Sequence, residues 1–397
     1  MNPTANRSVA FVPGSGYSPE GTDERRAAVR SERTAEKASD VMPGQRQRRP
    51  RLVRPLIWTL VASLALLGAA HSATPDAAKR HYDRASGLFR QGDFDGAIEA
   101  LKKSIEIDPR SAESYHLLGL AYFQGKKKPV EAAEALQRAL TLKPDSAEVL
   151  NDLADVYLSQ GKSAEAERAL TRAISVAPRD EEAYLDLAKL YEARHDRAAA
   201  IRTYEALLDF RQDHRDAVFS LASLYDNQGD SLRAQALLRK LVKTHPRHAD
   251  GWYLLGRIAE KANDLAEASY AYRQAIAAKP DLVDAHYNLG FIYRSQGRLA
   301  DAAKEFQEVI RLRPEYAEAH MNLGVVYTSL NKLDEAERAY ETAVALKPDF
   351  VEAHYNLGVF YELHRKDAAK ALAQYRKYRE LGGKDDRVER IVGQGGR

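Results

Sequence analysis

The feature that most constrains the fold of this 397-residue chain is a repeat of 34 residues that begins near Ala78. Proline marks the period, and it recurs at 34 residues or a multiple of 34 in Pro144, Pro178, Pro246, Pro280, Pro314 and Pro348. Pro109 precedes Pro144 by 35 residues, which one extra residue in the loop 125–129 explains, and Gln212 stands where a further proline is expected. Each repeat must therefore be one supersecondary unit that buries its apolar face against its neighbours.

Each repeat contains two amphipathic stretches, and small residues mark both. In the first stretch the small residue is Ala85, Gly119, Ala154, Ala188, Ala222, Gly256, Gly290, Gly324 or Gly358. An aromatic residue follows three places later in seven of nine copies: Tyr122, Tyr157, Tyr191, Tyr225, Tyr293, Tyr327 and Tyr361. In the second stretch an alanine recurs at Ala97, Ala132, Ala166, Ala200, Ala234, Ala268, Ala302, Ala336 and Ala371. These spacings predict two helices per repeat that pack closely through their small residues.

With this signature the chain resembles the tetratricopeptide repeat (TPR) family, in a run of nine repeats over about residues 78–383. The resemblance implies an all-α fold, a right-handed alpha-alpha superhelix or TPR solenoid, in which the first helices line a concave groove. Ala259 departs from the pattern by replacing the tyrosine of the sixth repeat, and the ninth repeat carries an inserted residue. We place the repeats at 74–384 and expect a short capping helix and a flexible tail in 385–397.

A basic leader and an apolar segment precede the repeats and predict export. Residues 1–54 contain eleven Lys and Arg against six Asp and Glu, a net charge of +5, so the rest of a +3 chain carries −2. The apolar run 56–70 follows an arginine cluster and precedes small residues, which is the order of a secretory signal peptide. We therefore predict a signal peptide in 55–73. A single N-terminal transmembrane anchor is the alternative, although about 20 apolar residues are usual for a membrane span.

In either case the arginine cluster would stay in the cytoplasm and the repeats would be exported across the inner membrane. They would then be periplasmic, or anchored in the inner membrane with the repeats on its outer side. Counted from Met1 the signal would be far longer than the usual 15–30 or so residues, whereas Met42 stands just before the arginine cluster. We hypothesise that translation begins at Met42 and that residues 1–41 are not translated. If they are made, the composition of residues 1–54 predicts disorder.

Composition excludes several classes of function. The chain has no cysteine, so disulfides, thiolate metal sites and a cysteine nucleophile are ruled out. A repeat region of net charge −2 has no electrostatic footprint for nucleic acid. The repeats leave no room for a catalytic domain, and no catalytic constellation stands apart from them, so we predict no enzyme, cofactor or metal. His286, His320 and His354 recur at the repeat spacing, but successive first helices lie too far apart to share one zinc ion, which favours helix packing.

A second stripe on the first helices faces away from the packing stripe, and asparagine recurs on it at Asn288, Asn322 and Asn356. Each amide can donate and accept, so it can pair with a peptide group of any sequence. The pattern resembles the asparagine ladder of O-linked N-acetylglucosamine transferase superhelices, which holds an extended polypeptide by its backbone. The same stripe adds apolar contacts through Phe291, Val325 and Val359. The alternative is that repeats seven to nine are recent copies of one another, so that a single asparagine without a binding role was duplicated with its repeat.

The ladder is confined to the C-terminal third, because the same place holds Leu117, Asp152, Asp186, Ser220 and Leu254 in repeats two to six. The carboxylate clamp of chaperone-binding TPR relatives is not matched. The places where its bases would be sought hold Tyr287, Met321, Tyr355, Phe291, Val325 and Val359. The sequence therefore does not predict capture of a C-terminal carboxylate.

Together these features predict an exported, non-enzymatic interaction scaffold or adaptor in cell-envelope assembly. Its partner would be a protein or an extended peptide bound in the concave groove, and it would contact the membrane only through residues 56–73, if these are not cleaved. The alternative is a permanent structural or self-associating subunit of an envelope complex.

Overall fold

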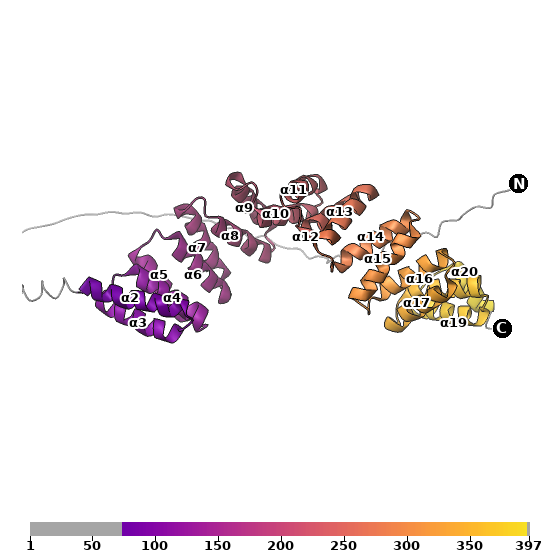
Figure 1. Cartoon of the computed structure of the whole chain (residues 1–397), viewed down its shortest axis with the longest axis horizontal. Coiled ribbons are helices and arrows are strands. Elements are labelled where there is room, and N and C mark those ends of the chain that lie inside the picture. Colours follow the sequence, from indigo (N-terminus) through magenta and orange to yellow (C-terminus); the bar gives the residue numbers. More distant parts are fainter. Residues whose placement is uncertain (1–73, 395–397) are drawn as a thin grey trace, which may run out of the picture. The chain divides into compact units, whose positions relative to one another are not determined.

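The computed structural model of this chain describes residues 74–394 (Figure 1). The predictions made for the leader, for the apolar segment up to Ala73 and for the last three residues of the tail lie outside the described residues. Within 74–394 there are helices and no strand, which confirms the predicted all-α class. None of the described helices has the length and apolar character needed to cross a membrane.

The helices follow one another in pairs, a first helix and a second helix, as the repeat predicts (Figure 1). The first helices are α2 (Thr74–Arg90), α4 (Ala112–Leu120), α6 (Ala147–Ser159), α8 (Glu181–Ala193), α10 (Arg215–Asn227), α12 (Ala249–Lys261), α14 (Val283–Ser295), α16 (Ala317–Ser329) and α18 (Val351–Phe360). The second helices are α3 (Phe94–Ile107), α5 (Pro129–Leu142), α7 (Ser163–Val176), α9 (Arg197–Phe210), α11 (Ser231–Thr244), α13 (Leu265–Ala278), α15 (Leu299–Leu312), α17 (Leu333–Leu346) and α19 (Ala368–Glu380). Each first helix packs most extensively on the second helix of its own pair and then on the helix before it.

The small residues predicted to lie between the helices of a pair are buried there. Gly256 shows why the site is small, because a Cβ atom on it would lie 2.7 Å from the ring of Tyr272 in the second helix. The same holds for Gly358, where the ring is that of Tyr375 at 2.6 Å. The aromatic ring of the second helix thus fills the space that the missing side chain leaves, and interiors of this density tolerate few added atoms.

A residue with positive φ closes most first helices. Glycine occupies this place at Gly92, Gly161, Gly229 and Gly297, and His195, Asn263 and Asn331 adopt the same left-handed conformation in other repeats, with φ near +59°. The left-handed region suits glycine best and asparagine next, so His195 is the strained member of the set.

Two pairs contain an extra residue, which the structure takes up as a π-helical turn at the end of the first helix. These turns are η1 (Ala121–Gly125) and η2 (Tyr361–Arg365). The sequence places the first insertion in the loop 125–129, whereas the structure widens the helix before that loop, because a π turn holds one more residue per turn than an α turn. Lys127 and Lys366 then reverse the chain with positive φ.

A last helix, α20 (Asp386–Gln394), follows where the sequence predicts a cap. Its Val388 and Val392 are buried, at 1 % and 5 % exposure, in the cluster that includes Tyr375 and Phe360. Arg387 donates to the carboxylate of Glu362 at 3.0 Å and to the hydroxyl of Tyr375 at 2.9 Å. The apolar end of the last pair is therefore covered by the chain itself.

Candidate functional site

The candidate site is a surface of three first helices, α14, α16 and α18, at the places of Asn288, Asn322, Asn356, Phe291, Val325 and Val359. We call these six residues the C-terminal first-helix surface. The opposite stripe of the same helices is core, since Leu289, Leu323 and Leu357 are buried against the second helices. Five of the six residues are half-buried, and Asn322 alone is fully buried.

The three asparagines are not equivalent. Asn322 is 2 % exposed. Its amide nitrogen donates to the Tyr287 hydroxyl at 3.0 Å and to the Glu318 carbonyl at 2.8 Å, and its oxygen accepts from the Arg294 guanidinium at 2.6 Å. These bonds link α16 to α14 and use most of the hydrogen-bonding capacity of the side chain.

Asn288 and Asn356 are held more loosely. Asn288 donates to the Tyr272 hydroxyl at 3.2 Å and also contacts the Tyr253 hydroxyl, which leaves its amide oxygen free within residues 74–394. Asn356 donates to the Met321 sulfur at 3.1 Å. A thioether is a weak acceptor, and an amide can donate two hydrogen bonds and accept two. Both side chains therefore keep hydrogen-bonding capacity for a ligand, in half-exposed positions.

The apolar members of the surface lie beside these amides. Val325 and Val359 pack against one cluster with Met321 and Tyr355. The Phe291 ring lies under the Arg294 guanidinium, with 4.6 Å between the guanidinium carbon and the ring centroid. Each of the three first helices thus contributes one amide and one apolar side chain to the surface.

Sequence reasoning missed Arg294, the one base in this part of the surface that touches both Phe291 and Asn322. Burial lowers the pKa of Arg294, with Tyr287 and Tyr340 acting in the opposite direction. Burial also raises the pKa of the Tyr287 hydroxyl to about 12, with Tyr316 and Glu318 adding to the shift. Tyr287 therefore stays protonated and remains a hydrogen-bond donor.

The corresponding surface of α6 and α8 is acidic, which the sequence analysis did not identify. Glu148, Asp152 and Asp155 follow one stripe of α6, and Glu182 and Asp186 follow it on α8. Burial raises the pKa of Asp155 to about 6, with further contributions from Asp186, Asp152 and Glu182. Burial also raises the pKa of Glu182, with Asp186, Asp180 and Asp152 adding to the shift.

The three recurring histidines fasten each first helix to the proline before it. His286 Nε2 lies 3.0 Å from the Pro280 carbonyl oxygen, and the corresponding distances are 2.8 Å for His320 and 3.0 Å for His354. Trp252 makes the same contact, since its indole nitrogen donates to the Pro246 carbonyl at 2.9 Å. The predicted role in packing therefore has a definite form, a ring N–H donated to a backbone carbonyl. Residues 74–394 contain no cluster of His, Asp and Glu that could hold a metal ion.

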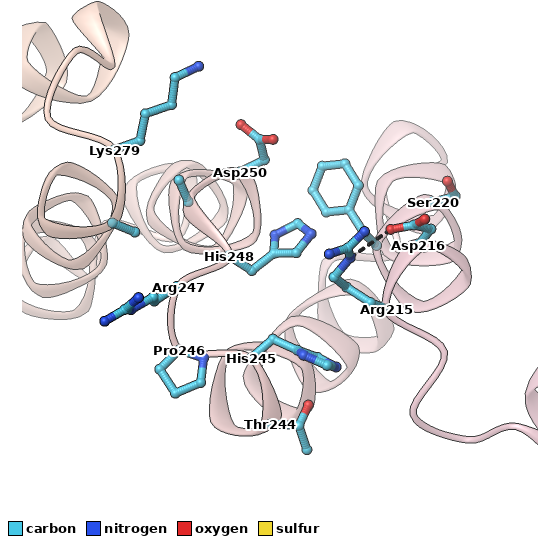
Figure 2. Close-up of a pocket in the computed structure, with 13 residues that line it drawn as sticks. Arg215, Asp216, Ser220, Thr244, His245, Pro246, Arg247, His248, Asp250 and Lys279 are labelled. Atoms are coloured by element: carbon cyan, nitrogen blue, oxygen red, sulfur yellow. Dashed lines mark hydrogen bonds and ion pairs between the residues drawn. The ribbon is translucent and has the colours of Figure 1, made fainter.

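A cavity of about 970 Å³ lies between the starts of α10 and α12 (Figure 2). His248 caps α12 by accepting from the Gly251 amide at 2.9 Å, and its ring contacts Phe219 at 5.1 Å between centroids. Arg215 is bonded to its neighbour Asp216 at 2.8 Å, and Figure 2 shows Arg215 and Arg247 pointing in different directions. The bases around this cavity do not converge, so it offers no defined anion site.

Comparisons with known proteins follow the repeat pattern. Residues 87–125, 290–330 and 326–364 match a family model described as TPR repeat. Three models described as tetratricopeptide repeat match residues 219–283, residues 124–190 and 158–225, and residues 271–304. No curated protein matches the chain at a significant level.

Solved structures with similar helix pairs include the following three. The crystal structure of the MamA protein is 24 % identical, with a TM-score of 0.40 over 43 % of this chain and 94 % of that one. YrrB, described as a TPR protein with an unusual peptide-binding site, is 20 % identical with a TM-score of 0.44 over 49 % and 98 %. The C-terminal part of a TPR protein from Cytophaga hutchinsonii is 16 % identical with a TM-score of 0.48 over 70 % and 99 %.

Proposed function

The chain belongs to the tetratricopeptide repeat family, and from this premise we propose that it is a non-enzymatic interaction scaffold for an extended segment of a partner protein. The segment binds on the C-terminal first-helix surface of α14, α16 and α18. A TPR fold supports the general role, since such repeats present long surfaces for protein binding.

The observation that carries the proposal is the spare hydrogen-bonding capacity of Asn288 and Asn356 beside half-buried apolar side chains. Successive first helices lie about 10 Å or more apart, and an extended peptide advances about 3.3 Å per residue. Amides on successive first helices therefore meet every third residue or so of an extended chain. Hydrogen bonds to peptide groups give affinity that is independent of sequence, and Phe291, Val325 and Val359 supply contact for apolar side chains.

Asn322 has a different part in this proposal. It lies between the two outer asparagines, but its bonds to Tyr287 and Arg294 hold α16 against α14. It is a positioning residue, which orients two groups of the surface.

The cap α20 bears on the alternative of a subunit that self-associates through its ends. Val388 and Val392 fill the apolar end of the last pair, so a second copy finds little apolar area to cover there. We therefore favour a scaffold that binds a partner along its helices. Elution of the purified chain as a stable oligomer without partner would favour the alternative.

The proposed place of action is the cell envelope, as the apolar segment 55–73 favours. Proteolysis of spheroplasts tests it: the repeats should be digested from outside the inner membrane. N-terminal sequencing of the native protein would distinguish cleavage near Ala73 from a retained anchor, and a start at Met42 from one at Met1.

The binding proposal is tested by selecting peptides from a displayed random library on the purified full-length chain. Selected peptides should bind as extended segments, and their affinity in titration calorimetry should fall when Val325 or Val359 is replaced by Glu. Equal affinity for these variants and the wild type would contradict binding on this surface. Circular dichroism verifies that the variants fold.

A further inference from the structure

Arg294 is a half-buried cation without a carboxylate partner among residues 74–394. Its guanidinium donates one hydrogen bond of 2.6 Å, to the neutral amide oxygen of Asn322, and lies over the Phe291 ring. A guanidinium has five N–H donors, so most of them are left for another group. Burying an uncompensated charge is costly, which makes this arrangement unusual for a purely structural residue.

The cations of the neighbouring first helix α12 and of the cap α20 lie close to carboxylates. Lys261 in α12 lies 3.0 Å from the carboxylate of Asp226, whose side chain is 4 % exposed, and Arg257 lies 4.0 Å from the same carboxylate. Arg387 in the cap pairs with Glu362. Arg294 therefore differs from Arg257, Lys261 and Arg387, each of which has a carboxylate within 4.0 Å.

The repeat register explains how the site arises. Arg294 stands four residues after Gly290, and the same place in other first helices is Phe89, Phe123, Leu158, Glu192, Asp226, Glu260, Thr328 or Glu362. Where it is Glu, the carboxylate accepts from a tyrosine of the second helix: Glu192 from Tyr204 at 2.5 Å, Glu260 from Tyr272 at 2.7 Å and Glu362 from Tyr375 at 2.5 Å. In the seventh repeat that tyrosine is Phe306, so both members of the internal bond have been replaced.

A second donor lies next to the guanidinium. Tyr287 accepts the Asn322 amide proton at its hydroxyl oxygen, so its own hydroxyl proton is directed elsewhere. Asn322 touches both groups, and it holds the guanidinium and the hydroxyl at neighbouring points of α14. Two fixed donors with positive charge form a site of the kind that a carboxylate fills, since charge-assisted hydrogen bonds to Arg are among the strongest in proteins.

We propose that Arg294 and Tyr287 bind the side-chain carboxylate of an Asp or Glu in the segment that the scaffold holds. This assignment rests on the proposed function and adds a sequence requirement to it: an acidic residue in the part of the partner that crosses from α14 to α16. The acidic stripe on α6 and α8 repels the same residue, so the site also sets where along the first helices an acidic segment lies.

The test uses the displayed random library with the full-length wild type, with Arg294→Gln and with Arg257→Gln as matched control. Arg257 is a cation of the neighbouring first helix whose charge Asp226 compensates. Peptides selected on the wild type and on Arg257→Gln should be enriched in Asp and Glu at one position, and those selected on Arg294→Gln should not. Equal enrichment on Arg294→Gln would overturn the assignment.

A selected peptide with amidated C-terminus then gives the affinity, and its amide cap leaves only side-chain carboxylates. Replacing its enriched Glu by Gln should weaken binding to the wild type by about tenfold or more, and to Arg294→Gln and Tyr287→Phe by clearly less. The same loss on all three proteins would overturn the assignment. The peptide substitution on the wild type needs no folded variant, so the assignment stays testable if Arg294→Gln proves unstable: affinity unchanged there would overturn it.

The two proposals fail differently. Peptides that bind without any acidic requirement would leave the proposed scaffold intact and overturn only the Arg294 assignment. Failure of the wild type to select any peptide would overturn the scaffold proposal and the assignment with it.

Discussion

The first-helix surface has two chemically different regions on one framework. On α6 and α8 it is acidic, and burial, together with repulsion from Asp152 and Asp186, raises the pKa values of Asp155 and Glu182. On α14, α16 and α18 it consists of amides, apolar side chains and the uncompensated Arg294. Both regions are built from the same helix pairs with a small residue between the helices of each pair. The framework positions therefore carry the fold, and the exposed positions are free to differ in what they bind.

Largest among the expected effects on stability is that of Asn322→Ala. The substitution removes the acceptor of Arg294 and the donor to Tyr287 inside the protein, so we expect a loss of about 2–3 kcal/mol in the free energy of unfolding. Asn288→Ala and Asn356→Ala should each cost less than about 1 kcal/mol, because these side chains are half-exposed and weakly bonded. Chemical denaturation measures all three. Equal losses would show that the three asparagines are equivalent after all.

The two regions also differ in a pH-dependent contact. His286 of α14 has no counterpart in repeats three to five, where Leu150, Tyr184 and Val218 stand at the same place. Burial acts to lower the pKa of His286, but its bonds to Glu305 and the Pro280 carbonyl outweigh burial and raise the pKa. These bonds of His286 therefore stabilise the folded protein fully below the ordinary histidine pKa of about 6.5. Their contribution to the free energy of unfolding is lost as pH rises through the raised pKa of His286.

Glu305→Gln tests this contact and reproduces the ninth repeat, where the partner of His354 is Gln374. The variant should be about 1–2 kcal/mol less stable than the wild type at pH 5.5, and this difference should shrink as pH rises through the raised pKa of His286. Urea denaturation at a series of pH values gives the difference. A gap that stays constant with pH would contradict the ion pair.

Asp155→Asn tests whether the ionised carboxylate of Asp155 destabilises the acidic region of α6 and α8. The pKa of Asp155 is about 6 against an ordinary 3.8, so its stabilising contribution is present below pH 4 and is lost as pH rises through 6. The variant should be more stable than the wild type at pH 7 by no more than about 1 kcal/mol, because the carboxylate is only partly buried and solvent screens its charge. At pH 4 the two should unfold alike. A variant that is less stable at pH 7 would contradict the repulsion.

The smallest effect is expected at the turns. His195→Gly should stabilise the fourth repeat by about 0.5 kcal/mol, because glycine adopts the positive φ of 59° more readily than histidine but loses more entropy on folding. Asn263→Gly is the matched control and should change stability less, since asparagine tolerates this conformation. Thermal unfolding followed by circular dichroism would detect the difference, and a destabilised His195→Gly would refute strain at this turn.

The periodic part of the structure was predictable because it depends on spacing alone. Small residues, alanines and prolines at fixed offsets predict the helix pairs, and family models match the same stretches. The burial of Asn322 was not predictable, because Asn288 and Asn356 stand at the same place and only the neighbours Tyr287 and Arg294 make it different. Arg294 could have been identified from the sequence, because it is the single base at a position that is acidic, aromatic, Leu or Thr in the other repeats.

The acidic stripe could also have been identified from the sequence, because Glu148, Asp152 and Asp155 lie three or four residues apart on one helix. Its effect on the pKa values depends on α8 packing beside α6, which spacing alone does not give. Both inserted residues are taken up in a π turn at the end of the first helix, which the spacing of the sequence does not indicate. These features depend on contacts between repeats, and the periodic sequence describes each repeat by itself.

The most direct test of the central claim compares one selected peptide on two double variants in titration calorimetry. Asn288→Ala/Asn356→Ala removes the outer amides of the C-terminal first-helix surface, and Asp152→Ala/Asp186→Ala changes the same register on α6 and α8. We expect the first variant to bind about tenfold more weakly than the wild type, as for the loss of two ordinary hydrogen bonds, and the second to bind within about twofold. Full affinity of a folded Asn288→Ala/Asn356→Ala protein, or an equal loss in both variants, would contradict binding at the C-terminal first-helix surface.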